Sequence, residues 1–427
     1  MFKLRAIAAG SVLLSLVSFQ AAAQELGNSP YSRFGLGEES SVGFLRNAGM
    51  AGLGVSTGNV YQINQINPAL LSNNKLVTFE LAASSQFKRI ENANTAQDDG
   101  NVGLKYLAFA FPVSKSWTTS VGLKPFSNVS YQIITETPVA SDTSMTARYL
   151  YQGSGGISEV YWANGVNIGK GLSAGVQGSF LFGTLINDAG TQIQDNEGIP
   201  TGNFVILSDR KTLKDVSLKG GLVYRAKLGE KLNMNLGVTY QYMFDFRAKQ
   251  VRTLSTIASL GNNSHTETDT LPASIGQQRI EMPHPIQVGV SIDKNNWMLG
   301  ADFQTQDWSG FSAYAAESEA MKRSYRVSVG GEITPDPNAI GYFKRVTYRA
   351  GVSYGQTPIY INGKQIDERQ ASFGLTLPTG RTGSVLNMAF IAGNRGTTEA
   401  GLIKETFFRF ELGLSLNDRW FIKRQVD

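Results

Sequence analysis

The sequence contains no cysteine and only two histidines, His265 and His284, among its 427 residues. A chain without cysteine forms neither a disulfide framework nor a thiolate metal site. Two isolated histidines offer little for metal binding or for acid–base catalysis. The sequence also lacks a Gly-x-Ser-x-Gly elbow, a His-Glu-x-x-His pair and a phosphate-binding loop. We therefore expect a protein that is not an enzyme and that holds no cofactor and no metal.

Beyond residue 23 the sequence has no apolar run near the roughly 18 residues that a transmembrane helix needs. The first 23 residues are different, because a basic start is followed by an apolar stretch and by three alanines that offer a cleavage site. This pattern is typical of a secretory signal peptide over residues 1–23, with a retained membrane anchor as the alternative. The formal net charge of +5 is too small to indicate a nucleic-acid partner. An exported chain of this kind is either soluble or a β-barrel.

What the sequence does contain is glycine, aromatic residues and long stretches of alternation. It has 46 Gly, 16 Tyr and 23 Phe, but only 41% hydrophobic residues. Between residues 213 and 246, apolar side chains occupy most second positions, and polar or charged side chains stand between them. Period-two alternation places the two sets on opposite faces of a strand. A hairpin of this length with one apolar face is typical of the wall of an outer-membrane barrel, with a soluble β-sandwich as the alternative.

Strand-like runs follow one another from residue 76 to the C-terminal region. They span residues 76–90, 102–113, 116–137, 146–169, 171–190, 204–227, 231–252, 284–293, 296–308, 322–333, 345–356, 370–377, 383–393 and 405–417. There are 14 such runs, and bacterial single-chain barrels have even strand numbers. We therefore predict an all-β fold, a 14-stranded antiparallel transmembrane β-barrel over residues 76–427, in the bacterial outer membrane. Charges on its inward faces should pair, because an unpaired buried charge is costly.

The predicted connections differ between the two ends of the strands. Tight connections are expected at 114–115, 170, 228–230 and 294–295, and long ones at 91–101, 191–203, 253–283 and 357–369. Short turns at one rim and long loops at the other are typical of the periplasmic and extracellular ends of an outer-membrane barrel. A sandwich has no reason to sort its loops in this way. The acidic residues at 97–101 offer oxygens to a calcium ion, but a solvated turn is the simpler interpretation.

Residues 24–75 do not alternate and are rich in Gly, Asn and Ser. Their scattered apolar and aromatic residues argue against disorder, which favours polar composition. We expect an N-terminal luminal hatch, a plug folded inside the barrel, with a disordered leader as the alternative. We expect Tyr31, Arg33 and Phe34 to anchor the start of this segment in the lumen. Their expected partners are Asp215, Asp245 and Glu411.

Pro125 and Phe126 interrupt the third predicted strand. Proline cannot donate to a ladder, so pairing must open or bulge at this point. A break in a barrel wall exposes backbone groups that lipid cannot satisfy, unless polar groups or water line the gap. The position is therefore a candidate lateral opening, with a simple bulge near the rim as the alternative.

Asn67-Pro68-Ala69 stands between the predicted hatch and the first predicted strand. A hatch that ends in this tripeptide and precedes 14 strands resembles the FadL-type outer-membrane transporters of long-chain fatty acids and other hydrophobic molecules. Residues 29–37 are similar to a leader found in FadL-like proteins of Bacteroidetes-type bacteria. The resemblance implies that Asn67, Pro68 and Ala69 set the geometry of the hatch. It also implies that an inward kink at Pro125 and Phe126 makes a lateral opening.

The resemblance implies a function as well, the passive uptake of a hydrophobic small molecule such as a long-chain fatty acid. The ligand would bind above the hatch and leave sideways or through the barrel after hatch movement. The inward faces are more polar and charged than the apolar pocket of that family. The alternative is therefore a non-transporting subunit of an outer-membrane secretion or barrel-assembly complex, which docks through residues 253–283. The expected partners are outer-membrane lipid, a hydrophobic small molecule and, for the alternative, other outer-membrane or periplasmic proteins.

Overall fold

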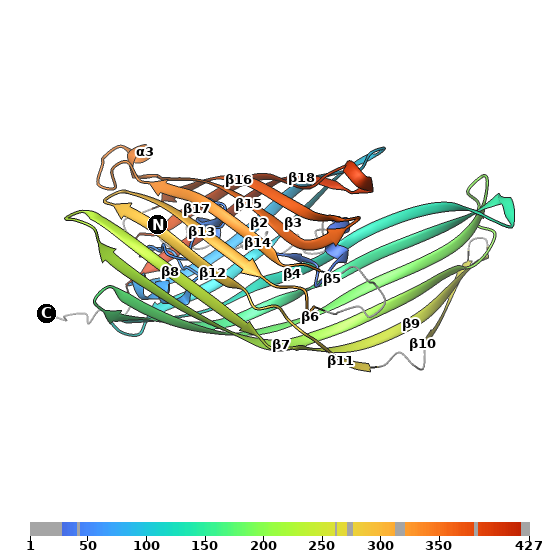
Figure 1. The fold of residues 1–427 in the computed structure, drawn as a ribbon, viewed down its shortest axis with the longest axis horizontal. Helices are drawn as coiled ribbons and strands as arrows, with labels where there is room; N and C mark the ends of the chain where they lie inside the picture. The colour runs from blue at the N-terminus through green and yellow to red at the C-terminus, as the bar shows by residue number, and fades with distance from the viewer. Residues whose placement is uncertain are drawn as a thin grey trace, which may run out of the picture.

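A computed structural model of the protein describes residues 28–40, 43–260, 263–270, 276–311, 321–379 and 383–419. The predicted signal peptide, residues 1–23, lies outside these ranges. Among the described residues, no helix is both long enough and apolar enough to cross a membrane. The described chain consists mainly of strands that pair in one sheet (Figure 1).

The strands of the wall are β2 (Val77–Glu91), β3 (Ala96–Pro112), β4 (Trp117–Val139), β5 (Asp142–Gly169), β6 (Leu172–Asp195), β7 (Phe204–Lys227), β8 (Leu232–Met243), β9 (Phe246–Leu260), β10 (Asn263–Thr270), β11 (Gly276–Ile280), β12 (Ile286–Lys294), β13 (Trp297–Gln306), β14 (Ser324–Ile333), β15 (Thr347–Ile361), β16 (Lys364–Pro378), β17 (Val385–Gly396) and β18 (Lys404–Asp418). Two barrel strands are interrupted. β8 and β9 follow one another along β7, and β10, β11 and β12 return along them. Counted in this way, the wall has 14 antiparallel strands, and β18 pairs with β2 to close it. The predicted 14-stranded barrel is confirmed.

Alternation decides which side chains face outwards. In β7, Val216, Leu218 and Leu222 are exposed on the outer face, whereas Asp215 and Ser217 are buried on the inner face. A single-layered wall offers its outer apolar side chains no protein partner, so this face matches a hydrocarbon phase. The inner face encloses a lumen that the N-terminal segment fills.

The two flanks of the barrel differ in height. β5 has 28 residues and β6 and β7 have 24 each, whereas β12 has 9 and β14 has 10. In Figure 1 the long strands β5, β6, β7 and β9 project well beyond the ends of the shorter ones at one rim. The opposite rim carries tight turns and the short helix α3 (Tyr342–Arg345).

Several loops predicted at the rim where the long strands project are much shorter in the structure, so these predictions are wrong. β2 and β3 are joined by residues 92–95 and β15 and β16 by Asn362–Gly363, while β9, β10 and β11 occupy much of the expected loop at 253–283. The polar residues there end the apolar alternation, but a ladder needs only backbone N–H and C=O groups. The strands therefore continue into polar sequence. The proposed docking loop is mostly a strand extension.

The N-terminal segment forms two consecutive parts inside the lumen. The leader, residues 28–40, contains the short helix η1 (Pro30–Arg33) and strand β1 (Glu38–Glu39). The hatch core, residues 43–74, contains α2 (Leu45–Ala48) and η2 (Pro68–Asn73). Most of its apolar side chains are almost completely buried, with Val60 and Tyr61 as exposed exceptions, and Phe44 stacks on Tyr106 of β3 with ring centroids 3.7 Å apart.

A ring of glycines lines the lumen where the hatch core meets the wall. Its members are Gly165, Gly175, Gly221, Gly237, Gly289, Gly330, Gly351, Gly374 and Gly413. A Cβ at Gly175 would lie 2.3 Å from the backbone nitrogen of Ala69, and one at Gly351 would lie 2.4 Å from the carbonyl carbon of Met50. The backbone of the hatch core therefore packs directly on the backbone of the wall, which only glycine permits.

Candidate functional site: the leader, the seam and the luminal cavity

The wall has a seam between β3 and β4. The two strands pair only from Leu107 opposite Leu123 to Pro112 opposite Thr118. Beyond Leu123, β4 continues along β5 and β3 continues along β2. Residues 96–106 of β3 and residues 124–139 of β4 are therefore not paired with each other. This seam is the gap that the leader occupies.

Pro125 and Phe126 lie where the ladder between β3 and β4 ends. The register of β4 against β5 shifts between Pro125 and Ser127, at a residue that has no N–H to donate. Phe126 packs against an apolar cluster that includes Leu36 of the leader and Val129. The candidate lateral opening thus coincides in position with the seam, and its opening stays a prediction.

Beyond Leu123 the leader takes the place of β3 as a pairing partner of β4. β1 pairs antiparallel with β4. On either side of β1, Ser40 N donates to Phe126 O at 3.0 Å and Ser29 N donates to Ser130 O at 2.8 Å. Lipid cannot satisfy free backbone groups, so these bonds remove a large cost from the wall. The leader therefore covers the free edge of β4 by strand addition.

Ion pairs hold the leader to the opposite side of the seam. Glu38 contacts Lys88 of β2 and Arg395 of β17, each at 3.1 Å. Glu405 of β18 is fully buried, contacts the same two cations at 3.4 and 3.6 Å, and accepts a hydrogen bond from Ser29 Oγ at 2.6 Å. Burial opposes ionisation of Glu38, but Lys88 and Arg395 hold the pKa of its carboxyl well below the usual range. The leader is therefore attached mainly through charges and backbone bonds.

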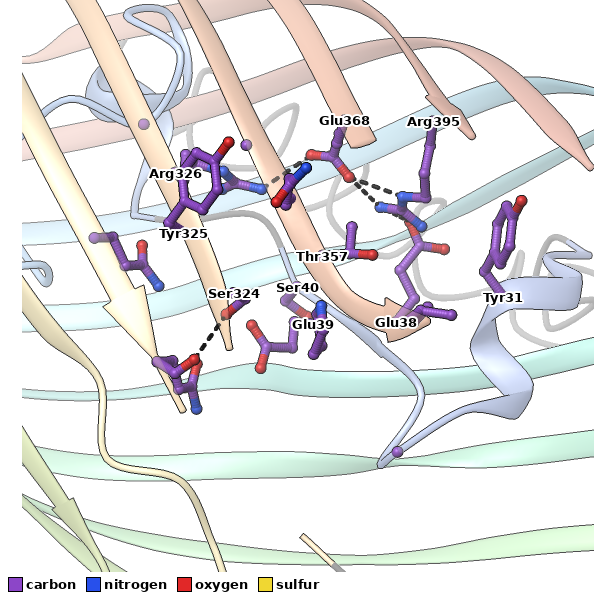
Figure 2. A pocket seen from close by; sticks show the side chains of 18 of the residues that line it. Tyr31, Glu38, Glu39, Ser40, Ser324, Tyr325, Arg326, Thr357, Glu368 and Arg395 are labelled. Carbon is purple, nitrogen blue, oxygen red and sulfur yellow. Dashed lines mark hydrogen bonds and ion pairs between the residues drawn. The ribbon is translucent and has the colours of Figure 1, made fainter. Parts of the chain in front are cut away.

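A cavity of about 150 Å³ lies between the leader and the wall. Its lining is part apolar and part charged and includes Phe34, Leu36, Trp308, Ile359, Arg326 and Arg395. Figure 2 shows Glu368 between Arg326 and Arg395, with ion-pair distances of 2.9 and 2.6 Å. Glu39 also lines the cavity, and its side chain is exposed. Burial raises the pKa of the Glu39 carboxyl.

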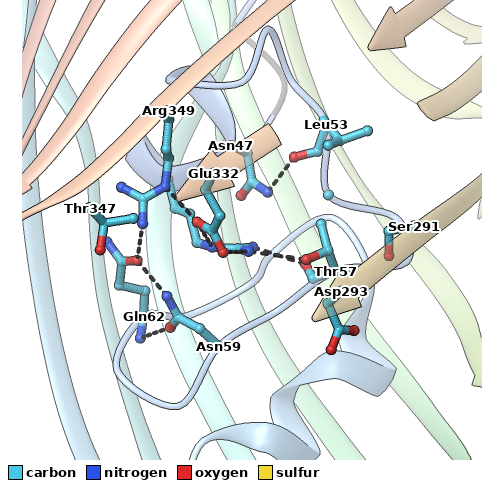
Figure 3. A network of polar contacts seen from close by, with 12 residues as sticks. Asn47, Leu53, Thr57, Asn59, Gln62, Ser291, Asp293, Glu332, Thr347 and Arg349 are labelled. Atoms are coloured by element: carbon cyan, nitrogen blue, oxygen red, sulfur yellow. Dashed lines mark hydrogen bonds and ion pairs between the residues drawn. The ribbon is translucent and has the colours of Figure 1, made fainter. Parts of the chain in front are cut away.

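The hatch core is fixed by a second set of charges (Figure 3). Arg46 of α2 and Arg349 of β15 contact the carboxylate of Glu332 in β14 at 2.6 and 2.8 Å. Arg46 also donates to Thr57 O at 3.0 Å, and Arg349 donates to Gln62 Oε1 at 3.2 Å. The predicted pairing of inward charges is confirmed here. These contacts join the hatch core to two strands of the wall.

Asn67, Pro68 and Ala69 lie at the start of η2. Asn67 Oδ1 accepts a bond from Ala69 N at 3.0 Å, and Pro68 occupies a first-turn position where no N–H is needed. Asn67 Nδ2 donates to Val55 O at 2.8 Å and to Leu222 O of β7 at 3.2 Å. The tripeptide therefore connects the end of the hatch core to the wall.

The three aromatic and basic residues expected to anchor the leader do contact the wall. The Tyr31 hydroxyl donates to Ile403 O. Arg33 lies over the ring of Tyr151, 5.9 Å from its centroid. Phe34 packs against the cluster that contains Tyr31 and Ile359.

Two of the three carboxylates expected as partners of the leader pair instead with cations of the wall. Glu411 contacts Lys105 at 2.5 Å, and Asp215 contacts Arg247 at 3.6 Å. Asp245 is exposed at the break between β8 and β9. Both pairs lie within the wall: Glu411 of β18 contacts Lys105 of β3, two strands away, and Asp215 of β7 contacts Arg247 of the adjacent β9.

The sequence analysis missed Glu38, Glu405 and the ring of glycines. Glu38 belongs to a segment without periodicity, so no pattern marked its direction. Glu405 and the glycines occupy inward positions of their strands. The period-two alternation of each strand could have marked these residues as facing the lumen. The register between strands, which brings these positions together, is not visible in a single strand.

Comparison with known proteins agrees with this architecture. A model of the family described as BamG matches residues 4–427, and no curated protein matches the chain. Among solved structures, the chain is similar to a toluene transporter, TodX, of P. putida (15% identity, 91% of this chain and 100% of that chain, TM-score 0.58). It is also similar to the CymD monoaromatic hydrocarbon channel (14%, 90% and 99%, 0.54) and to a FadL homologue of Pseudomonas aeruginosa (11%, 88% and 98%, 0.56). The barrel is FadL-like, and the chain is a protein of the bacterial outer membrane.

Proposed function

The chain belongs to the BamG family, and we propose that it is a channel for the passive uptake of small hydrophobic molecules across the outer membrane. One observation carries this proposal: the leader that forms a wall of the cavity also occupies the seam between β3 and β4. A molecule in the cavity therefore borders the element that separates it from lipid. The similarity in fold to TodX, a toluene transporter, and to CymD, a monoaromatic hydrocarbon channel, is consistent with this function.

The proposed route leaves the barrel sideways. The hatch core packs backbone to backbone on the glycine ring, so its displacement would have to break many contacts at once. The leader is held by a few backbone bonds and ion pairs. Its displacement would free the edge of β4 near Pro125 and Phe126, and water from the lumen would then solvate the exposed backbone groups.

The size of the cavity favours a compact ligand. A cavity of about 150 Å³ lined by apolar residues is known to hold benzene, whereas pockets for larger ligands span about 300–1,000 Å³. The cavity of this chain has about 150 Å³. We propose a hydrophobic molecule of about one ring for the closed state. A long-chain fatty acid would fit only after the leader moves.

A disulfide across the seam tests the route. Ser32 Oγ bonds to both O and N of Ser130 at 3.0 Å, and the chain has no cysteine of its own. In cells that carry Ser32→Cys/Ser130→Cys as the only copy, we expect oxidation to lower toluene uptake at least fivefold and reduction to restore it. The single variant Ser32→Cys serves as the control for the oxidant. Equal uptake by the oxidised and reduced double variant would exclude the lateral route.

A second function is favoured by the fixed hatch core and the ion-paired lumen. These features suit a closed barrel that serves as a non-transporting subunit of an outer-membrane secretion or barrel-assembly complex. Solubilisation in mild detergent and affinity purification of the full chain distinguish the two. Stoichiometric partner proteins, together with toluene uptake that does not depend on the chain, would establish this alternative.

A further inference from the structure

The lipid-facing side of the wall has a hollow on the flank of the shorter strands. This outer hollow has a volume of about 510 Å³ and lies on β14, β15, β16 and β17. The exposed side chains that line it are Val327, Val329, Val352, Tyr354, Arg369, Ala371, Ala392 and Asn394. Because these side chains stand on the outer face of the barrel, the surrounding lipid is what fills the outer hollow.

The register between strands explains why the wall is hollow at this point. Ala371 lies opposite Val352 on one side and opposite Ala392 on the other. Two residues nearer the rim with the tight turns, the same ladder places Phe373 opposite Phe390. Side chains two residues apart stand on the same face of a strand, so the two alanines leave space beside the larger rings. An acyl chain in this space would gain contacts on several sides, whereas an empty gap would forfeit them.

Two hydrogen-bond donors stand at the polar end of the outer hollow. Arg369 lies directly opposite Asn394 in the pairing of β16 with β17, two residues nearer the projecting rim than the alanines. The guanidinium group lies 5.5 Å from the ring centroid of Tyr354. Neither Arg369 nor Asn394 makes an ion pair or a hydrogen bond through its side chain within the described part of the chain. The carboxylate of Asp367, two residues before Arg369, accepts a hydrogen bond from Gln356 at 3.1 Å.

The donors lie where the wall passes from hydrocarbon to headgroups. Tyr325 and Tyr354 form an edge-to-face pair there, with ring centroids 6.3 Å apart. Tyrosine is enriched at membrane–water interfaces, where one end of the side chain is apolar and the other is hydrated. The next position towards the projecting rim pairs Gln356 with Asp367, and both are polar. Since the tight turns mark the periplasmic rim, Arg369 stands at the headgroups of the outer leaflet.

We propose that the outer hollow binds lipid A, the phosphorylated and multiply acylated lipid of the outer leaflet. A phosphate group of the lipid pairs with the guanidinium of Arg369 and accepts a hydrogen bond from the side-chain amide of Asn394. The planar guanidinium matches the oxygens of a phosphate in two parallel hydrogen bonds. One acyl chain fills the space beside Ala371 and Ala392. The site does not depend on the proposed uptake function, because it lies outside the lumen.

Native mass spectrometry of the full-length protein in detergent tests the phosphate contact. Each protein is titrated with diphosphorylated lipid A, and the fraction that carries one lipid gives the dissociation constant. We expect Arg369→Gln to weaken the binding of lipid A by about fivefold or more, because the charge that pairs with the phosphate is lost. Arg210→Gln removes an exposed arginine from β7, on the other flank of the barrel, and should stay within about twofold of the wild-type protein.

A substitution that fills the outer hollow tests the acyl chain separately. Ala371→Phe places a ring where the chain would lie, so we expect it to weaken the binding of lipid A by about fivefold or more. Ala350→Phe makes the same change at an exposed position of β15 outside the outer hollow and should bind lipid A as the wild-type protein does. Both positions face lipid, so neither ring has to enter the packed interior.

Three results would overturn the proposal. Equal affinities of the wild-type protein and Arg369→Gln would exclude the phosphate contact. Equal affinities of Ala371→Phe and Ala350→Phe would show that lipid A contacts the wall without entering the outer hollow. Binding of phosphatidylglycerol as tightly as lipid A would exclude selection of the outer-leaflet lipid. Uptake of toluene enters none of these measurements, so their failure is distinguishable from failure of the proposed function.

Discussion

The hatch core and the leader are consecutive parts of one segment inside one lumen, but different forces hold them. The hatch core presses its backbone against a ring of glycines and shares Glu332 with two buried arginines. The leader lies along an open strand edge and is attached by β1, Glu38 and Glu405. Close backbone packing has no alternative arrangement of similar energy. Edge bonds and ion pairs can be exchanged for water one by one.

This difference indicates which part of the N-terminal segment can move in a functional cycle. We expect the hatch core to stay in place in the lumen. We expect the leader, which lies beside the cavity, to be the part that can leave the edge of β4. Each of the following experiments tests this division, from the largest expected effect to the smallest.

Glu332→Gln should cause the largest loss of folding stability. The change leaves the guanidinium groups of Arg46 and Arg349, each 4% exposed, without their shared carboxylate. Removal of one partner from a buried ion pair typically costs about 3–5 kcal/mol. We expect a decrease of that size in the free energy of unfolding, measured by urea titration in micelles. Asp307→Asn breaks the exposed pair with Arg323 and should cost less than about 1 kcal/mol. Equal losses in both variants would contradict the special role of the hatch core.

Gly175→Ala should cause the second-largest loss of folding stability. The new Cβ would lie 2.3 Å from backbone atoms of Pro68 and Ala69, so the hatch core or β6 must shift. Overpacking of this kind typically costs about 1–3 kcal/mol. Gly178→Ala on the same strand is the matched control, because its Cβ would lie 3.8 Å from the nearest atom, in Leu218. An unfolding free energy that is equal in the two variants would show that the ring tolerates side chains.

Glu38→Gln should loosen the leader and leave the hatch core unchanged. The variant loses the charge that pairs with Lys88 and Arg395. Trypsin reports both regions at once, since Arg33 lies in the leader and Arg46 in the hatch core. We expect cleavage after Arg33 to become about tenfold faster, and cleavage after Arg46 to stay as slow as in the wild-type protein. Faster cleavage at both sites would mean that the two regions move together.

The stability of the leader in its closed position should depend on pH through two opposite contributions of moderate size, one from Glu38 and one from Glu39. Burial opposes ionisation of Glu38, but its cationic neighbours lower its pKa. Its stabilising effect is therefore complete above the unfolded value of about 4.3 and is lost as the pH falls through the lower folded value. Burial raises the pKa of Glu39, so its ionisation destabilises the leader as the pH rises above about 4.3.

Hydrogen exchange of the leader amides measures this balance. We expect Glu39→Gln to increase their protection about twofold at pH 7.5 and to leave it unchanged at pH 4, where Glu39 is already protonated. Glu38→Gln should lower the protection at pH 7.5. If Glu39→Gln lowers the protection at pH 7.5, Glu39 must have a cationic partner in the closed state.

Much of the wall could be predicted from local alternation. The strand predicted at 204–227 coincides with β7, and the tight turns at one rim lie where they were expected. The loops at the other rim were wrong, because a polar sequence can still pair through its backbone. Of the candidate site, Pro125 was marked by residue type, since proline changes strand pairing at its own position. Asn67 was marked by the resemblance of its tripeptide to FadL-type transporters.

The amino-acid sequence by itself determined which face of each strand meets lipid and where the barrel begins, since both follow from neighbours two residues apart. Only the tertiary structure decided that Glu38 pairs with Lys88 and Arg395, that glycines from separate strands form one ring, and that the leader pairs with β4 where β3 does not. The physical reason is distance along the chain. Contacts between residues separated by hundreds of positions depend on strand register and barrel closure, which no local pattern encodes.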